Sequence, residues 1–266
     1  MKLRSIYVAA FSVWALSAHA GPARDVSLGT ADSFAVLAAT TVTNTGPTLI
    51  NGNLGVWPGT AVTGFPPGIV TGGTIHAGDA VAMQAQSDKH AAYTFAAGEP
   101  GATDLTGINL GGLTLTPGVY KFSSSAQLTG TLTLDAQSNP NAVFLFQIGS
   151  TLTTASASDV DIINGGTGDS VFWQVGSSAT LGTTTDFAGN ILALTSITLN
   201  TGATIQCGRA LADNGAVTLD TNIVSIDTAG CETTTAAVPE PGSATLLGMG
   251  LLLSLTGYWW QSRKQS

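Results

Sequence analysis

Apolar residues recur in short alternating segments along most of the chain, and the clearest repeat lies between Val171 and Ser225. Each copy opens with an apolar segment, passes through a short tract of Gly, Ser, Thr or Asn, and resumes with a Thr-Leu pair. Trp173, Leu192 and Leu211 mark successive copies, 19 residues apart. A period near 20 with β-branched and apolar alternation is typical of solenoid proteins. We therefore expect one β-helix coil of three short strands per copy, with fainter copies at 143–154 and 119–134.

The repeat also predicts the surface of such a solenoid. Nineteen residues at a rise of about 3.3 Å each trace a loop of at most about 60 Å, and stacked coils lie about 4.8 Å apart. Equivalent side chains then form straight columns. Small hydroxyl and glycine positions that return in every coil predict a flat, weakly polar, regularly spaced face.

One long helix interrupts the strands. Residues 26–75 contain short apolar strands bounded by Gly, Pro and Asn. Residues 77–97 are rich in Ala and lack Pro, Asp79 is placed to cap the first turn, and Gly98 follows the last turn. We expect this helix to pack along the outside of the solenoid. The residues near its apolar face are Val81, Ala85, Ala92 and Phe95.

The N-terminal segment predicts export. Residues 1–20 combine a basic start, an apolar stretch and an Ala-x-Ala cleavage site, the order of a secretory signal peptide.

The C-terminal segment predicts sorting at a membrane. Residues 243–260 form an uncharged, mostly apolar run that is long enough to span a bilayer, and Arg263 and Lys264 follow it. Before the run stands the motif Val238-Pro239-Glu240-Pro241. This order of parts resembles the PEP-CTERM sorting signal of Gram-negative bacteria. The resemblance implies recognition by an exosortase-type enzyme, cleavage near the motif, and release or attachment outside the cell; an ordinary membrane anchor is the alternative.

These segments divide the chain into a signal peptide (1–20), a solenoid body (21–232), a linker (233–237) and a sorting tail (238–266). Residues 21–241 hold four basic residues and all 16 acidic residues, so nucleic acid and anionic lipid are poor partners for the body. The membrane is expected to contact the chain only through the tail. Charged residues make up only 9% of the chain, and the surface must therefore be built largely from Thr, Ser, Asn and Gly.

The candidate reactive residues point to no catalytic or metal centre. Cys207 and Cys231 are expected to form a disulfide in an exported protein, with a free pair as the alternative. The strand pair Asp159 and Asp161 has no further oxygen cluster beside it in the sequence, so we read it as solvated rather than as a metal site. No nucleophile with a base and an orienting acid is recognisable around His76 or His90. We predict no cofactor.

The body resembles the DUF3494 family, the β-solenoid ice-binding proteins of microbes. The matching stretches are Leu28–Leu37, Asn51–Val56, Leu113–Tyr120, Phe144–Gly149, Phe172–Gly176, Asn190–Ala193 and Gly208–Leu211. The resemblance implies an all-β fold with one long helix: a right-handed, roughly triangular β-helix with the helix packed alongside. It also implies binding to the surface of an ice crystal. We expect the exported protein to be a monomer.

The resemblance further implies that short Thr, Ser, Ala and Gly tracts on one flat side contact ice. In this sequence those residues are Thr40, Ser150, Thr151, Ser177, Ser178, Thr195, Ser196, Asn214 and Gly215. These tracts show no continuous Thr-x-Thr ladder. Two alternatives stay open: an adhesin of the biofilm matrix that binds glycans, and a β-helical enzyme that degrades polysaccharides, which would need a cleft with paired carboxylates.

Overall fold

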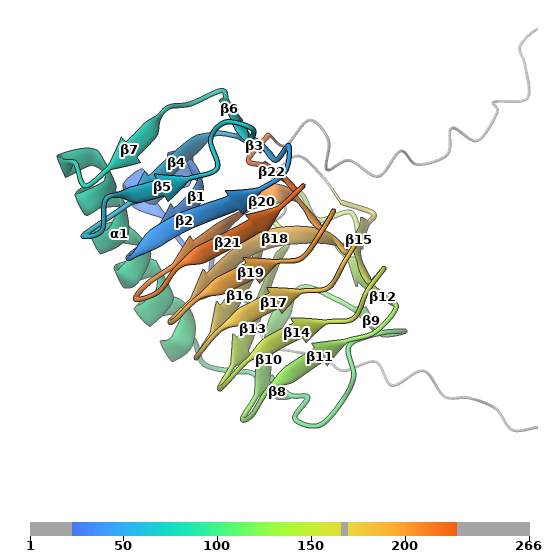
Figure 1. Cartoon of the computed structure of the whole chain (residues 1–266). Helices are drawn as coiled ribbons and strands as arrows, with labels where there is room; N and C mark the ends of the chain where they lie inside the picture. The colour runs from blue at the N-terminus through green and yellow to red at the C-terminus, as the bar shows by residue number, and fades with distance from the viewer. Residues whose placement is uncertain (1–22, 166–169, 228–266) are drawn as a thin grey trace, which may run out of the picture. The chain divides into compact units, whose positions relative to one another are not determined.

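The computed structural model describes residues 23–165 and 170–227, which form a three-sided solenoid of parallel strands with one long helix alongside (Figure 1). The predicted β-solenoid with an external helix is therefore confirmed. The signal peptide, the linker, the sorting tail and Cys231 lie outside the described residues. Within the described ranges no helix is both long and apolar enough to cross a membrane, and the predicted span at 243–260 lies beyond them.

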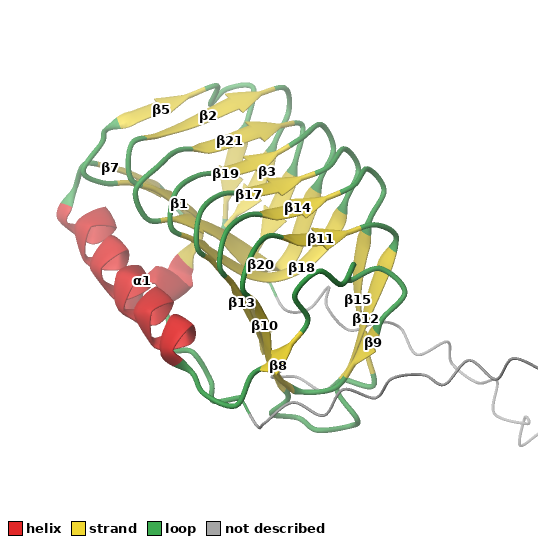
Figure 2. Ribbon diagram, turned by 90° about the horizontal axis from the view of Figure 1, so that it is seen from below, coloured by secondary structure: helices red, strands yellow, loops and turns green. Residues whose placement is uncertain are grey.

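The first side of the solenoid, the helix face, is the side on which α1 (Ala80–Gly98) packs (Figure 2). Its strands, in spatial order, are β7 (Ile75–Ala77), β4 (Asn53–Val56), β1 (Phe34–Ala38), β20 (Thr204–Ala212), β18 (Asp186–Ala193), β16 (Ser170–Val175), β13 (Val143–Ile148), β10 (Gly118–Phe122) and β8 (Thr103–Asp104). Only the C-terminal halves of β18 and β20 belong to this side.

The second side, the threonine face, is a separate seven-stranded sheet. Its strands, in spatial order, are β5 (Ala61–Thr63), β2 (Thr41–Thr45), β21 (Val217–Asp220), β19 (Ile197–Leu199), β17 (Ala179–Leu181), β14 (Leu152–Thr154) and β11 (Ala126–Leu128).

The third side, the acidic face, bears Asp135, Asp159, Asp161 and Asp186. It contains the N-terminal halves of β20 and β18 together with β6 (Ile69–Thr71), β3 (Leu49–Asn51), β22 (Ile223–Ser225), β15 (Asp159–Ile163), β12 (Thr131–Asp135) and β9 (Thr114–Leu115).

Glycine allows β18 and β20 to turn from the acidic face to the helix face. Gly189 has a φ of +102°, a conformation that side chains with a Cβ rarely adopt, and the register of the two strands shifts there. A Cβ added to Gly208 would lie 1.9 Å from the carbonyl oxygen of Gly189. The two bends can therefore stack only because both positions are glycine.

The first described coil lies inside the stack and not at its end. β1 pairs with β20, β2 with β21 and β3 with β22, so the first coil lies on the last one, as the adjoining blue and orange strands show (Figure 1). From there the chain builds a second coil outward, returns along α1, and builds the remaining coils back toward its start. α1 is 19 residues long. Such a helix extends about 28 Å, which is about the distance across seven of the nine strands on the helix face.

Two apolar clusters hold these parts together. The interior of the solenoid is filled from all three sides. Tyr120, Phe146 and Trp173 stack there with ring centroids 5.5 and 4.0 Å apart, and Phe187 lies tilted against Trp173 at 4.9 Å. A second cluster joins α1 to outward-facing residues of the helix face, including Leu37, Leu192 and Leu211. The helix is thus part of the fold's core.

The predicted helix is confirmed with a later start. It begins at Ala80 because residues 75–77 pair as β7, and Asp79 caps it by accepting a hydrogen bond from the Ala82 amide at 2.9 Å. The predicted apolar side is partly wrong, since Val81 and Phe95 are 48% and 38% exposed. The side that packs on the sheet carries Ala82, Ala85, Gln86, Lys89, Ala92 and Ala96.

Small alanines bring α1 close to the sheet, and polar side chains complete the contact. Gln86 donates from Nε2 to the carbonyl of Ala212 at 3.1 Å, and Lys89 donates from Nζ to the carbonyl of Ala193 at 3.0 Å. From the sheet, Gln147 donates to the carbonyls of Ala96 and Glu99 at 2.8 and 2.7 Å. The last contact satisfies carbonyls that a helix end leaves without partners.

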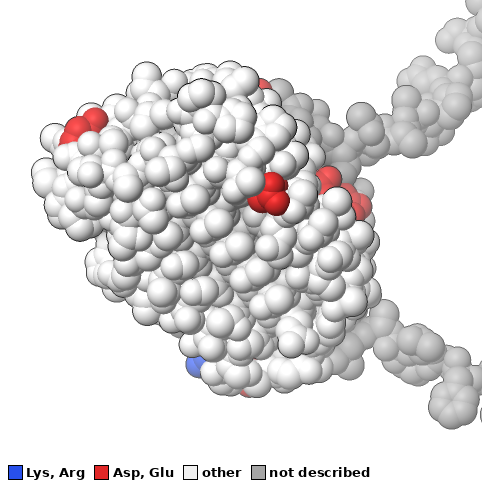
Figure 3. All heavy atoms as spheres, viewed as in Figure 1, with Lys and Arg blue, Asp and Glu red and all other residues white. Residues whose placement is uncertain are grey.

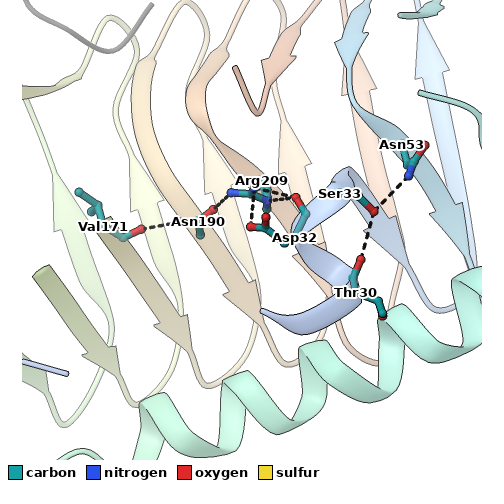
Figure 4. Close-up of polar contacts among 7 residues, drawn as sticks. All are labelled: Thr30, Asp32, Ser33, Asn53, Val171, Asn190 and Arg209. Atoms are coloured by element: carbon teal, nitrogen blue, oxygen red, sulfur yellow. Dashed lines mark hydrogen bonds and ion pairs between the residues drawn. The ribbon is translucent and has the colours of Figure 1, made fainter. Parts of the chain in front are cut away.

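Arg209 fastens the short helix η1 (Gly29–Ser33) to the helix face (Figure 4). Its guanidinium donates to the carbonyl and the carboxylate of Asp32 and to Oδ1 of Asn190, at 2.6 to 2.9 Å. Asn190 in turn donates to the carbonyl of Val171 at 3.1 Å. Arg209 therefore has a structural role.

Candidate binding face

The threonine face presents one unbroken column of threonines. In β2, β14, β17, β19 and β21 the residues on either side of one threonine are buried, while that threonine points outward. Thr43 lies in register with Thr63 on one side and with Thr218 on the other, and the series continues through Thr198, Thr180 and Thr153. Gln127 ends the column at β11. Six threonines from six different coils thus stand in one row.

The threonines of this column are rigid and regularly spaced. Neighbouring strands lie about 4.8 Å apart, so the hydroxyl and methyl groups repeat at that interval. Threonine has few χ1 rotamers on a strand, and the face loses little side-chain entropy when it meets a solid surface. The column can therefore offer a fixed array of small groups over six coils.

A second, mixed column borders the first one. It consists of the residues two positions before each central residue: Ser125, Thr151, Ser178, Ser196, Ala216, Thr41 and Ala61. Several of these side chains bond to the next coil, as Thr151 Oγ1 does to Ser125 Oγ at 2.8 Å and Ser196 Oγ does by accepting the Ala216 amide at 3.2 Å. These bonds restrict the hydroxyl groups at the edge of the face.

The nine residues predicted from the sequence lie together along one corner of the solenoid, between the helix face and the threonine face. Thr151, Ser178 and Ser196 belong to the second column. Thr40, Ser150, Ser177, Thr195 and Gly215 lie one residue farther back in the turns, and Asn214 lies two residues back. Gly215 is buried, and its carbonyl accepts the amides of Ala39 and Thr40. The predicted residues thus lie at the edge of the threonine face, and the threonines of its central column were not among them. The repeated Thr-Leu pairs were the signal for that column, because their leucines are buried and their threonines are not.

Charge is almost absent from the threonine face. Figure 3 shows its surface nearly free of Lys, Arg, Asp and Glu. Among the described residues, the ion pairs lie elsewhere: Arg24–Glu99, His76–Asp79, Lys89–Asp213, His90–Asp213 and Arg209–Asp32. The acidic face, in contrast, carries neighbouring carboxylates, because Asp159 lies beside Asp186 in register. Partial burial and the charges of Asp186 and Asp161 raise the pKa of Asp159.

Both described histidines have an acidic neighbour that sequence reasoning did not find. His76 bonds to Asp79 through Nδ1 at 2.8 Å and to Thr74 Oγ1 through Nε2 at 2.9 Å. Asp79 is also the cap of α1, and its pKa is lowered mainly by the Ala82 amide and by His76. This group braces the start of the helix. Within residues 23–165 and 170–227, no cluster of three or more His, Cys, Asp or Glu side chains could hold a metal ion.

Cys207 lies within β20 at a φ of +52°. Its predicted partner, Cys231, lies outside the described residues, and the disulfide stays a prediction.

Comparisons with known proteins agree with this architecture. An ice-binding protein of Nostoc sp. (strain HG1) is 55% identical over 99% of both chains. The crystal structure of an ice-binding protein from an Antarctic biological consortium superposes with a TM-score of 0.72 at 47% identity, over 78% of this chain and 93% of that one. The ice-binding protein of the ascomycete Antarctomyces psychrotrophicus gives a TM-score of 0.73 at 43% identity, over 76% of this chain and 98% of that one. The sequence profile described as Ice-binding-like matches residues 36–225, and the chain therefore belongs to the Ice-binding-like family.

Proposed function

We propose that this protein binds ice through the threonine face and thereby inhibits ice growth and recrystallisation. The observation that carries the proposal is the in-register column of Thr153, Thr180, Thr198, Thr218, Thr43 and Thr63 on a sheet that is nearly free of charge. Membership of the Ice-binding-like family supports it.

The nature of an ice surface accounts for the regular and nearly uncharged character of the threonine face. An ice surface offers neither charge nor a pocket, only a repeating array of water oxygens, so a protein must match it by area and regularity. Each hydroxyl or methyl contact is weak, and a rigid row of six coils lets many weak contacts form together without a large loss of entropy. We infer that the face orders water between its threonines in an ice-like layer, which then joins the crystal.

An enzymatic role has less support. A glycoside hydrolase needs two carboxylates roughly 5–10 Å apart flanking its substrate. The groove between α1 and the turns of the solenoid is lined by one carboxylate, that of Asp213. Asp159 and Asp186 are close neighbours in register, but both lie on the outer side of the acidic face.

A substitution in the centre of the column tests the proposal. Thr198→Tyr places a large ring among the threonines, which prevents close approach of a flat crystal, and we expect most of the thermal hysteresis and recrystallisation inhibition to be lost. The matched control is Thr131→Tyr, an exposed threonine on a strand of the acidic face. Circular dichroism verifies that both variants fold. Equal activity in wild type and Thr198→Tyr would exclude the threonine face as the ice contact.

We also propose that the product is exported and processed at its tail. The signal peptide and the PEP-CTERM-like motif at 238–241 support this fate. Mass spectrometry of the extracellular protein should find an N-terminus near Gly21 and a C-terminus near the motif. An intact tail at 242–266 in the extracellular product would contradict the proposal.

A further inference from the structure

A groove lies between α1 and the turns that join the helix face to the threonine face. Its volume is about 670 Å³, within the range of roughly 300–1,000 Å³ that is usual for small-molecule sites. The turns contribute Trp57, Pro58 and Asn214, and α1 contributes Met83, Gln86 and His90. Nothing in ice binding requires such a groove.

The groove contains a buried polar group with an unused hydrogen-bonding site. Gln86 is only 6% exposed, and its Nε2 donates to the carbonyl of Ala212. Its Oε1 has no hydrogen-bond partner among the described residues. An unpaired buried acceptor is destabilising, because it has lost its hydrogen bonds to water. The oxygen is almost inaccessible to solvent, so a ligand that donates a hydrogen bond to it from the groove requires a rotation of the Gln86 side chain.

The groove carries no unpaired charge among its described residues. Its carboxylate, that of Asp213, pairs with Nδ1 of His90 at 2.7 Å and with Nζ of Lys89 at 3.4 Å. A charged ligand would have to compete with these pairs. The preferred ligand is therefore neutral and carries several hydrogen-bond donors.

The apolar part of the groove includes an indole ring that solvent can reach. Trp57 is partly exposed, whereas Trp173, the other tryptophan in the described part of the chain, is fully buried. Met83 and Pro58, both exposed, lie beside it in the lining. An aromatic ring with a polar handle suits a ligand that has one apolar face and a polar edge.

We propose that this groove binds a neutral saccharide unit. A sugar ring presents C–H groups on one face, which suit the Trp57 ring, and hydroxyl groups around its edge, which suit Gln86, Asn214 and His90. The groove opens on the α1 side of the turns, and the central threonine column lies on the sheet beyond them. A saccharide in the groove therefore leaves the column free for ice, so that the protein can be held in a neutral polysaccharide while its face meets a crystal.

Binding is tested with the purified protein and three neutral trisaccharides: maltotriose, cellotriose and mannotriose. We expect saturation transfer to at least one of them, and a shift of the indole N–H resonance of Trp57, which is assigned from the spectrum of a Trp57→Phe variant. The resonance of Trp173 should stay in place. If none of the three sugars shows transfer and the Trp57 resonance does not move at millimolar sugar, the proposal is overturned.

Variants locate the site and separate it from ice binding. Trp57→Ala and Gln86→Leu should each raise the dissociation constant for the sugar at least about tenfold. Trp57→Phe keeps an aromatic face and should retain most of the affinity. Val81→Ala, an exposed change on the same helix outside the groove, is the control. Thr198→Tyr should keep sugar binding, and Trp57→Ala should keep ice activity. Sugar binding that survives both groove variants would place the saccharide elsewhere and contradict the proposal.

Discussion

Lys89 carries an ammonium group into the contact between α1 and the helix face, where its side chain is fully buried. Its partners are the carbonyl of Ala193, the carboxylate of Asp213 and the ring of Tyr93. Burial outweighs the attraction of Asp213 and lowers the pKa of Lys89 from 10.5 to about 8. The unfolded chain therefore binds more protons at this residue between pH 8 and pH 10.5, and stability must rise with pH in that window.

The size of the effect makes it measurable. A pKa shift of this size corresponds to about 3 kcal/mol at full development, at 1.36 kcal/mol per unit. We expect the free energy of unfolding by urea to increase from pH 8 to pH 10 in the wild type, and this increase to be much smaller in Lys89→Met. Above pH 10 the raised pKa values of Tyr93 and Tyr120 act in the opposite direction, so the comparison ends there. The same pH slope in both proteins would show that Lys89 is not the responsible group.

At the scale of elements, α1 shows how far sequence patterns reach. Its Ala-rich composition, its cap at Asp79 and its end at Gly98 predicted the helix within three residues. The choice of Val81 and Phe95 for the packed side failed, because size and polarity do not reveal which alanines must approach a sheet closely. Gln86 and Lys89 are buried for a reason that lies on other strands, namely the carbonyls of Ala212 and Ala193.

The strands show a similar limit. The repeated Thr-Leu pairs indicated the coil period directly. Whether a given side chain points into the solenoid or out of it depends on the strand register, because a shift of one residue exchanges inner and outer positions. The tracts were therefore placed on the face itself, whereas the structure puts most of them in the turns beside it. The pairing of β2 with β21 could not be predicted either. It joins residues more than 170 positions apart, and no local pattern records a parallel pairing over such a distance.

For the whole molecule, that pairing makes the face depend on both ends of the solenoid. The column is built from two separate parts of the chain: Thr43 and Thr63 precede α1, and the other four threonines follow it. The two parts meet where Thr43 lies beside Thr218, with no covalent connection between their coils other than the long path through α1. If an ice crystal contacts the whole column, these two neighbours must contribute about equally.

We therefore expect Thr43→Tyr and Thr218→Tyr to reduce thermal hysteresis to a similar extent, because each places a ring at the same point of the face. Thr71→Tyr is the control for the N-terminal coils, since Thr71 is exposed on β6 of the acidic face. Ice-shaping assays and hysteresis on folded variants measure the effect. A loss in Thr218→Tyr without a loss in Thr43→Tyr would mean that the ice contact stops at the last coil. A similar loss in both variants would show that ice contacts the column on both sides of the junction between β2 and β21, which only the folded protein creates.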